Sequence, residues 1–482
     1  DPEAAVKALN TCYTYLGNMD EQLYCEAMTD NAYTKQPNDF TQNIGNGSYS
    51  TADSYVKQVW DGRYTGIRMC NQLLENIDRV PDLDPELKKR YIGEAKVLRA
   101  YSYYELYTKF GDIPYTTKVL SIKESMSIAR TAKATVIANV LADLDEVING
   151  NYLPTSYDAD NKGRITRWAA MAIKAKIYLF EGNWTQVKNI TSTIMTEGGF
   201  KLFGSYAGLF EIANEYNSEV ILYAQYRPTS REHQMMYVFL PPTLGGYSQL
   251  SPLQELVDSY IMLDGKTIKE TGTSFDESHP YANRDPRLKA TVMYTGNSYT
   301  LADGTEVVIN CEKGEGKDGY GVGSDCSATG YYIKKYWDNT YRATLYSGLN
   351  PILIRYADIL LMNAEALAEL GELDKTAWDA TIKPIRDRAG FTLASALEFP
   401  EGASKDKLIE IVRNERRSEL ALEGHRHKDI IRWRIADNVL NGWCHGLKTN
   451  DVVGTDDGYV RVENRTFNAN RHYLWPIPQA VT

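Results

Sequence analysis

The sequence predicts a mainly α-helical protein in which helical hairpins form a scaffold and carry an irregular lobe with short strands. Three observations support this fold class: helical periodicity in both end regions, two stretches that read as helix, glycine turn and helix, and a middle stretch rich in Gly and Pro. They divide the chain into an N-terminal helical region (1–197), an irregular ligand-binding lobe (198–350) and a C-terminal helical region (351–482).

The N-terminal region reads as a series of amphipathic helices. Apolar residues recur there at i, i+3, i+4 and i+7, which is the spacing of one helix face. The pattern covers segments near 2–16, 54–78, 84–109, 132–149 and 166–197. The third segment has the clearest ends, because Asp84 can cap its start, Pro85 fits the first turn, and Gly111 follows its last residue.

Two stretches predict paired helices with tetratricopeptide-like packing. Ala169, Ala172 and Ala175 would let a second helix approach closely before the turn at Gly182. The same order of small residues, glycine turn and second helix returns between 356 and 390. Plain helical hairpins remain an alternative.

Residues 198–350 differ from the helical regions on either side. Short alternating stretches at 219–224 and 306–309 read as short strands or loops within a loop-rich lobe. Long irregular stretches are usually functional or mobile. We therefore expect a loosely packed lobe whose tyrosines face water.

Composition excludes several classes of function. Lys and Arg total 53 against 63 Asp and Glu, a net charge of −10, which argues against binding to nucleic acid or to an anionic membrane surface. No apolar run approaches the length of a membrane-spanning helix. Tyrosine is abundant, 35 residues against 11 Phe and 8 Trp, and its flat ring and hydroxyl suit half-buried or ligand-facing surfaces.

The ionisable residues form no convincing catalytic set. Glu415, Glu419 and Glu423 are four apart and predict one stripe of a helix, whereas a glycosidase needs two carboxyl groups that face each other across a bond. Because Arg413, Arg416, Arg417 and Arg426 lie within reach, we expect the glutamates to form a buried or half-buried ion-pair network with them. His425 and His427 should diverge on a helix and so not share a metal. The sequence therefore predicts no enzyme and no cofactor.

Two structural questions stay open at this level. The stretch 158–163 (DADNKG) resembles the start of an EF-hand loop, but Lys162 and Ala169 stand where ligands belong. It predicts a solvated turn, with a weak structural calcium site as the alternative. The six cysteines contain no CxxC pair, and either a Cys311–Cys326 bridge or six separate thiols fits.

Several segments resemble, in chain order, the SusD/RagB family of outer-membrane nutrient-uptake lipoproteins of Bacteroidetes. The strongest is 414–426 (NERRSELALEGHR), followed by Asp429 and Arg432-Trp433. The others are 95–101 (AKVLRAY) with 111–114 (GDIP), 283–287 (NRDPR), 355–361 (RYADILL) with 364–366 (AEA), 386–390 (RDRAG) and 473–479 (YLWPIPQ).

This resemblance implies a body of four tetratricopeptide-like hairpins and a lobe that holds much of the ligand surface. It also implies a surface-exposed lipoprotein of the cell outer membrane that binds an oligo- or polysaccharide without cleaving it. The partner would be a SusC-like, TonB-dependent β-barrel transporter. The chain opens at Asp1 and reads as a trimmed product, so the lipid-bearing cysteine is expected outside it; Cys12 lies in a predicted helix.

Three other functions remain as alternatives. The RagB branch of the family implies a peptide ligand in place of a glycan. An intracellular tetratricopeptide scaffold would show regular repeats and no long lobe. A glycosidase would need two carboxylates that face each other across a cleft.

Sugar rings pack on aromatic faces while polar side chains bind their hydroxyls, so a shallow aromatic platform is the expected site. Position in loop-rich stretches is the basis for choosing its residues. The predicted aromatic contacts are Tyr33, Phe40, Tyr49, Tyr247, Tyr299, Tyr320 and Trp337, and the predicted polar contacts are Asn38, Asn46, Asp338 and Arg342.

Overall fold

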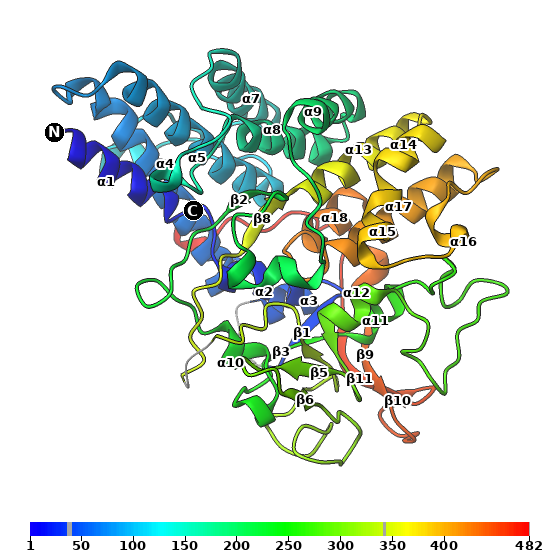
Figure 1. Cartoon of the computed structure of the whole chain (residues 1–482). Coiled ribbons are helices and arrows are strands. Elements are labelled where there is room, and N and C mark those ends of the chain that lie inside the picture. Colours follow the sequence, from blue (N-terminus) through cyan, green and yellow to red (C-terminus); the bar gives the residue numbers. More distant parts are fainter. Residues whose placement is uncertain (36–40, 341–343, 482) are drawn as a thin grey trace.

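A computed structural model describes residues 1–35, 41–340 and 344–481. The predicted contacts Asn38, Phe40 and Arg342 lie outside these residues. Figure 1 shows an arc of helices along the top of the molecule and the less regular lobe below it.

The arc is one continuous array of helices in which neighbours pack side by side. Its members are α1 (Pro2–Tyr13), α4 (Ser54–Asn76), α5 (Pro85–Phe110), α7 (Lys133–Asn149), α8 (Arg167–Glu181), α9 (Trp184–Glu197), α13 (Tyr356–Leu370) and α17 (Lys405–Glu419). Helix α9 packs directly on α13, although the whole lobe lies between them in sequence. The lobe is thus an insertion, and the mainly helical fold predicted from periodicity is confirmed.

Local sequence signals set the ends of these helices as predicted. The carboxylate of Asp84 accepts hydrogen bonds from the amides of Glu86 and Leu87, both at 3.0 Å, and so caps α5. Gly182 and Gly371 end α8 and α13 in the left-handed region, with φ of 71° and 72°. The small residues of α8 are fully buried, which allows α9 to approach closely.

Shorter helices lie between the members of the array, after α17 and within the lobe. They are α2 (Met19–Tyr24), α3 (Gln42–Asn46), α6 (Ile122–Ser125), α10 (Met235–Phe239), α11 (Gln254–Ser259), α12 (Pro286–Thr291), α14 (Lys375–Ala380), α15 (Ile382–Ala389), α16 (Ala394–Leu397), α18 (Arg426–Arg432) and α19 (Ala436–Val439). The turn predicted at Asp158 is a single 3-10 turn, and the carboxylate of Asp158 caps it by accepting from the Asn161 amide at 3.0 Å.

Small antiparallel sheets lie mainly in the lobe. The pairs are β1 (Ala32–Thr34) with β3 (Leu250–Pro252), β2 (Val220–Tyr223) with β8 (Ile352–Arg355), β4 (Val292–Met293) with β7 (Tyr332–Ile333), and β5 (Ser298–Thr300) with β6 (Glu306–Val308). A three-stranded sheet has the order β10 (Thr455–Asp456), β11 (Tyr459–Arg465) and β9 (Gly442–Lys448). Strands β2 and β6 show that the two segments read as strands or loops are strands.

The lobe is densely packed, and our expectation of a loose lobe with water-facing tyrosines is wrong. Its core contains fully buried rings, among them Tyr299 and Tyr332. These tyrosines can be buried because their hydroxyls find acceptors: Tyr299 donates to the Ile333 carbonyl at 2.7 Å and Tyr332 to the Asp318 carbonyl at 2.6 Å. Residues from 19–32 and 421–447 join this core, so it draws on three separate parts of the chain.

Two further observations concern the cysteines and the membrane. All six cysteine thiols are free, so the Cys311–Cys326 bridge is absent and the alternative of separate thiols holds. Within the described ranges, no helix is both long enough and apolar enough to cross a bilayer.

Candidate functional site

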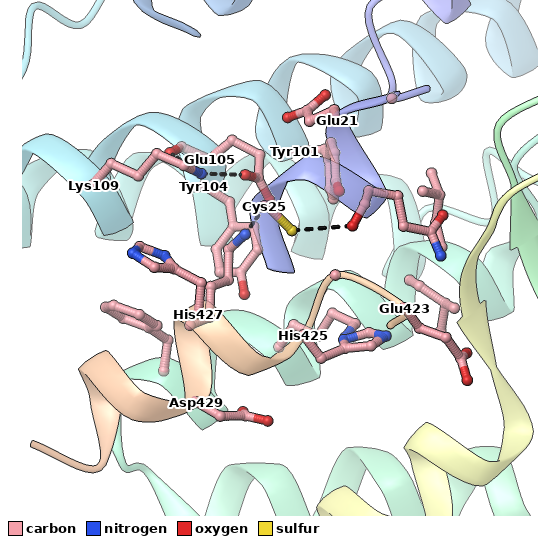
Figure 2. Close-up of a pocket in the computed structure, with 18 of the residues that line it drawn as sticks. Glu21, Cys25, Tyr101, Tyr104, Glu105, Lys109, Glu423, His425, His427 and Asp429 are labelled. Carbon is pink, nitrogen blue, oxygen red and sulfur yellow. Dashed lines mark hydrogen bonds and ion pairs between the residues drawn. The ribbon is translucent and has the colours of Figure 1, made fainter. Parts of the chain in front are cut away.

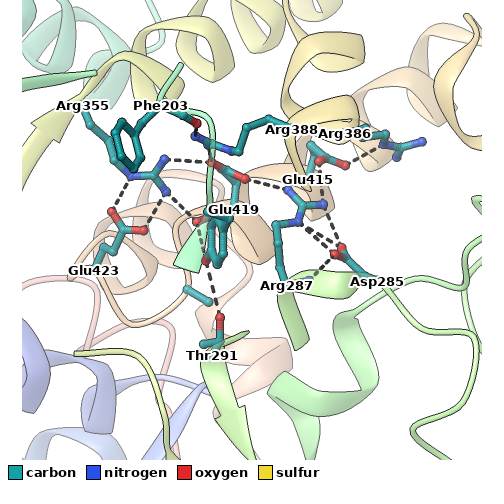
Figure 3. A network of polar contacts seen from close by, with 12 residues as sticks. Phe203, Asp285, Arg287, Thr291, Arg355, Arg386, Arg388, Glu415, Glu419 and Glu423 are labelled. Atoms are coloured by element: carbon teal, nitrogen blue, oxygen red, sulfur yellow. Dashed lines mark hydrogen bonds and ion pairs between the residues drawn. The ribbon is translucent and has the colours of Figure 1, made fainter. Parts of the chain in front are cut away.

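A buried network of charges fills the junction between the helical array and the lobe (Figure 3). Arg355, at the end of β8, is its centre. Its Nη1 donates to carboxylate oxygens of Glu219 and Glu419, both at 2.8 Å, and its Nη2 donates to Glu423 Oε1 at 2.7 Å. All four side chains are essentially excluded from solvent.

A second arginine extends the network toward α12. Arg287 pairs with Asp285 at 2.7 Å, with Glu415 at 2.8 Å and with Glu419 at 2.9 Å. Arg386 holds the other oxygen of Glu415 at 2.8 Å. The predicted ion-pair network is therefore confirmed in kind, but its arginines are not the expected neighbours in the sequence. The neighbours Arg416 and Arg417 pair with aspartates instead, because they point to other sides of α17.

The three glutamates do not form one helix stripe, however. Helix α17 ends at Glu419, and Leu422 turns the chain with a φ of 61°, so Glu423 lies in the turn beyond the helix. Burial alone would raise the pKa of Glu419, but Arg388, Arg355 and Arg287 hold it well below its usual range. A carboxylate held in this way binds the scaffold together and is a poor general acid.

A polar cavity of about 100 Å³ lies between α2, α5, α8 and the start of α18 (Figure 2). Lys109 and Glu105, one turn apart on α5, form an ion pair of 2.6 Å in its wall. The rings of His425 and His427 point toward opposite ends of the cavity, which confirms that they diverge. Burial, with nearby lysines, lowers the pKa of each to about 3, so both are neutral at pH 7. The volume is far below the roughly 300–1,000 Å³ of typical ligand pockets, so this cavity does not hold a glycan.

A pair of stacked tyrosines, one exposed and one half-buried, lies on the surface of the lobe. The Tyr247 side chain is 47% exposed, and its ring stacks on Tyr237 with 5.4 Å between centroids and 19° between planes. The turn between them sets this geometry. A Cβ at Gly246 would lie 2.1 Å from the Leu240 carbonyl oxygen, so only glycine lets the chain fold back on the end of α10. The Tyr247 amide then donates to the Tyr237 carbonyl at 2.7 Å.

Polar and aromatic groups extend this pair into a strip. The Tyr24 hydroxyl donates to Gln249 Oε1 at 3.4 Å, beside the start of β3. On the other side, Gly245 lies against Leu345, and the next residue, Tyr346, is 37% exposed. We call Tyr24, Tyr237, Tyr247, Gln249 and Tyr346 the tyrosine strip. Rings with exposed faces and an amide side chain are the groups that bind carbohydrate.

The predicted contacts are scattered by the fold. Only Tyr247 belongs to the tyrosine strip. Tyr33, Tyr320 and Trp337 are half-buried, and Trp337 donates its indole N–H to the Thr300 carbonyl at 2.8 Å. Asn46 donates to Glu463 at 3.3 Å.

Three predicted contacts are buried and cannot present a face to a surface ligand. Tyr299 belongs to the lobe core. Tyr49 is buried against His472. Asp338 is buried and accepts from Ser347 Oγ and Thr340 Oγ1, both at 2.6 Å. These predictions fail because position in a loop-rich stretch does not distinguish a buried ring from an exposed one.

Sequence reasoning missed Tyr24, Tyr237, Gln249 and Tyr346. A usable signal existed for Tyr237. It stands ten residues before Tyr247, across a segment that contains Pro241, Pro242 and the Gly245-Gly246 pair. Such a segment reverses the chain and brings its flanks together.

Comparison with known proteins identifies the family of this fold. A family profile described as "SusD family" matches residues 209–482, more than half of the chain. The chain belongs to the SusD family. A second profile, described as "Starch-binding associating with outer membrane", matches residues 5–179. The resemblance seen in the sequence motifs is thereby confirmed.

Individual SusD-like proteins match along most of the chain. SusD-like protein P25 of Formosa agariphila is 28% identical over 409 residues, 80% of this chain and 71% of its own. The structure of a SusD-like carbohydrate binding protein from Bacteroides fragilis aligns with a TM-score of 0.88 at 27% identity and covers 100% of this chain and 98% of its own. A laminarin binding SusD-like protein aligns with a TM-score of 0.73 at 23% identity over 99% and 96% of the two chains, which shows the shared fold alone.

Proposed function

We propose that this SusD-family protein is a cell-surface lipoprotein that captures an oligo- or polysaccharide and delivers it uncleaved to a SusC-like, TonB-dependent outer-membrane transporter. The observation that carries the proposal is the stacking of the exposed Tyr247 ring on Tyr237 at the surface of the densely packed lobe. The profile described as starch-binding supports the class of ligand. The SusD-like carbohydrate binding protein of Bacteroides fragilis, which is 27% identical, supports the same class.

The physical basis is complementarity between sugar rings and the tyrosine strip. A pyranose presents C–H groups on its face, which pack on an aromatic ring, while its hydroxyls bind phenol and amide groups such as Tyr24 and Gln249. Because the strip rests on a packed core, its rings are already positioned and little entropy is lost on binding. The glutamates of the segment 414–426 are held by arginines in the buried network. A glycosidase, in contrast, needs two carboxyl groups that face each other across the bond to be cleaved.

Calorimetry against a panel of neutral and acidic oligosaccharides and polysaccharides tests the ligand class. We expect saturable binding to at least one glycan and no new reducing ends after long incubation. Binding to peptides and to no glycan would favour the RagB-like alternative, and release of reducing ends would indicate a glycosidase.

Purification from the native outer membrane tests localisation and partner. We expect the protein to co-purify with a TonB-dependent barrel, and its N-terminal peptide to carry a lipid by mass spectrometry. Recovery in the soluble fraction without a barrel would contradict delivery to a transporter.

A further inference from the structure

A hollow that is separate from the buried cavity lies where the lobe meets the C-terminal helices. Its volume is about 450 Å³, and its lining includes residues of α11, α17, α19 and β9. In Figure 1, β9 lies to the right of α10. The lining of the hollow contains no residue of the tyrosine strip. We propose that this hollow, which we call the tryptophan hollow after Trp443, is a second saccharide-binding site for a neutral glycan.

Trp443 supplies the ring on which a sugar can stack. It is 43% exposed, although tryptophan is usually covered in a folded protein. The guanidinium of Arg461 lies over the ring, 5.5 Å from its centroid, and Arg461 is fixed in turn by Asp456 at 2.9 Å. Arg461 does not line the hollow, so it braces the ring from outside. Within the described part of the chain, the indole N–H of Trp443 makes no hydrogen bond.

Polar groups with unused capacity line the same hollow. Asp258 accepts from Gln254 through Oδ1 at 2.8 Å, while its Oδ2 has no hydrogen-bond partner in the ranges that the structure describes. Lys269 is exposed and lies near Asp258 without an ion pair in those ranges. Asn414 donates to the Ser259 carbonyl at 3.0 Å and keeps its amide oxygen for a ligand. The hollow thus offers acceptors and donors in a small space, as sugar hydroxyls require.

The charge balance of the hollow favours a neutral ligand. Its other charged groups are already paired. Glu255 is held by His445 at 2.8 Å, and Asp30 is held by Arg417 at 3.1 Å. What remains is one carboxylate, Asp258, and one ammonium, Lys269, which compensate each other. A charged ligand would leave one of them opposed by a like charge, whereas hydroxyl groups can bind both.

The class of ligand rests on the proposed function, while the location rests on the hollow alone. Titration calorimetry and native mass spectrometry with neutral hexasaccharides (maltohexaose, cellohexaose, laminarihexaose and xylohexaose) would test both. For a hexasaccharide that binds, we expect two sites per protein. Trp443→Ala should weaken binding at the tryptophan hollow about tenfold, and Tyr247→Ala should weaken binding at the tyrosine strip by a similar factor.

Control variants separate recognition from folding. Trp443→Tyr keeps a ring and should retain the second site with an affinity within a few-fold, while Asp258→Asn should weaken it about tenfold. Leu393→Ala, at an exposed apolar residue elsewhere, should change neither site. Thermal unfolding checks that each variant is folded.

The outcomes distinguish the two proposals. If the wild type binds the glycan at one site, and Trp443→Ala and Asp258→Asn bind as the wild type does, the second site is overturned and the proposed function is kept. Binding that depends on Trp443 and not on Tyr247 would uphold the second site and reject the tyrosine strip. Failure of the wild-type protein to bind any neutral glycan would overturn the second site, whereas the proposed function is overturned only if the acidic glycans of the panel fail to bind as well.

Discussion

Arg355 holds Glu419 twice, at its side chain and at its backbone. Its Nη1 lies 2.8 Å from Glu419 Oε1, and its Nη2 lies 2.7 Å from the Glu419 carbonyl oxygen. Because Glu419 is the last residue of α17 and Arg355 ends β8, this contact joins the helical array to the strand that leaves the lobe. The segments 355–361 and 414–426, which both resemble family motifs, therefore stabilise the fold from its interior.

Replacing Arg355 by Leu should destabilise the protein strongly. The change leaves Glu219, Glu419 and Glu423 buried beside one another with too few cations. Removing one partner of a buried ion pair typically costs about 3–5 kcal/mol. Urea unfolding monitored by circular dichroism measures the change in the free energy of unfolding. Lys7→Ala is the control, because the side chains of Lys7 and Glu3 are 72% and 74% exposed, and its cost should stay below about 1 kcal/mol. A similar small cost for both variants would contradict a structural role for the network.

The sheet of β9 and β11 should lose a stabilising contribution at alkaline pH. His445 donates to Glu255 at 2.8 Å and to Asp456 at 2.9 Å, which requires both ring nitrogens to be protonated. The hydrogen bond to Glu255, followed by that to Asp456, raises the pKa of His445 to about 9. The stabilisation is thus fully present below the unfolded-state pKa of about 6.5 and is lost as pH rises through 9.

Thermal unfolding of the wild type and of His445→Gln at pH 6.5 and pH 9.5 checks this sign. We expect the wild type to be the more stable protein at pH 6.5 and the difference to narrow at pH 9.5. A difference that stays constant between the two pH values would show that His445 does not change its charge over this range.

The polar cavity should make the fold sensitive to acid. Burial, with Lys109 and Lys428 nearby, lowers the pKa of His427 to about 3. The unfolded chain binds a proton at this residue below about pH 6.5, while the folded protein does not, so stability falls as pH drops from 6.5 toward 3. His427→Gln removes this contribution. Unfolding midpoints at pH 7 and pH 4.5 should therefore fall less for the variant than for the wild type; an equal fall would contradict the prediction.

Tyr247→Ala should weaken glycan binding about tenfold, which corresponds to about 1.4 kcal/mol. The variant removes the outer ring of the stack. Because the Tyr247 side chain is not part of a buried core, the fold should be little affected. Calorimetry with the best glycan from the panel measures the loss. Tyr247→Phe keeps the ring and should lose much less, while Leu474→Ala, at another exposed apolar residue, should bind as the wild type does. Equal affinity of Tyr247→Ala and wild type would remove the tyrosine strip as the site.

Much of the fold could be predicted because its signals are local. The periodicity of 84–109, with Asp84 before it and Gly111 after it, is sufficient to place α5. The ion-pair network was also predictable in kind, since glutamates and arginines interleave in one helical segment. Its partners Arg287 and Glu219 were not, because they come from distant parts of the chain.

The amino-acid sequence by itself determined the helical array, its ends and the family to which the chain belongs, because helix periodicity, capping residues and ordered motifs are properties of neighbouring residues. Only the tertiary structure decided which tyrosines meet water. Tyr299 is covered by a lobe core gathered from three parts of the chain, whereas Tyr247 is turned outward by the close return of Gly246 on Leu240. Exposure of a ring depends on what packs over it, and that packing is set by contacts between residues far apart in the sequence.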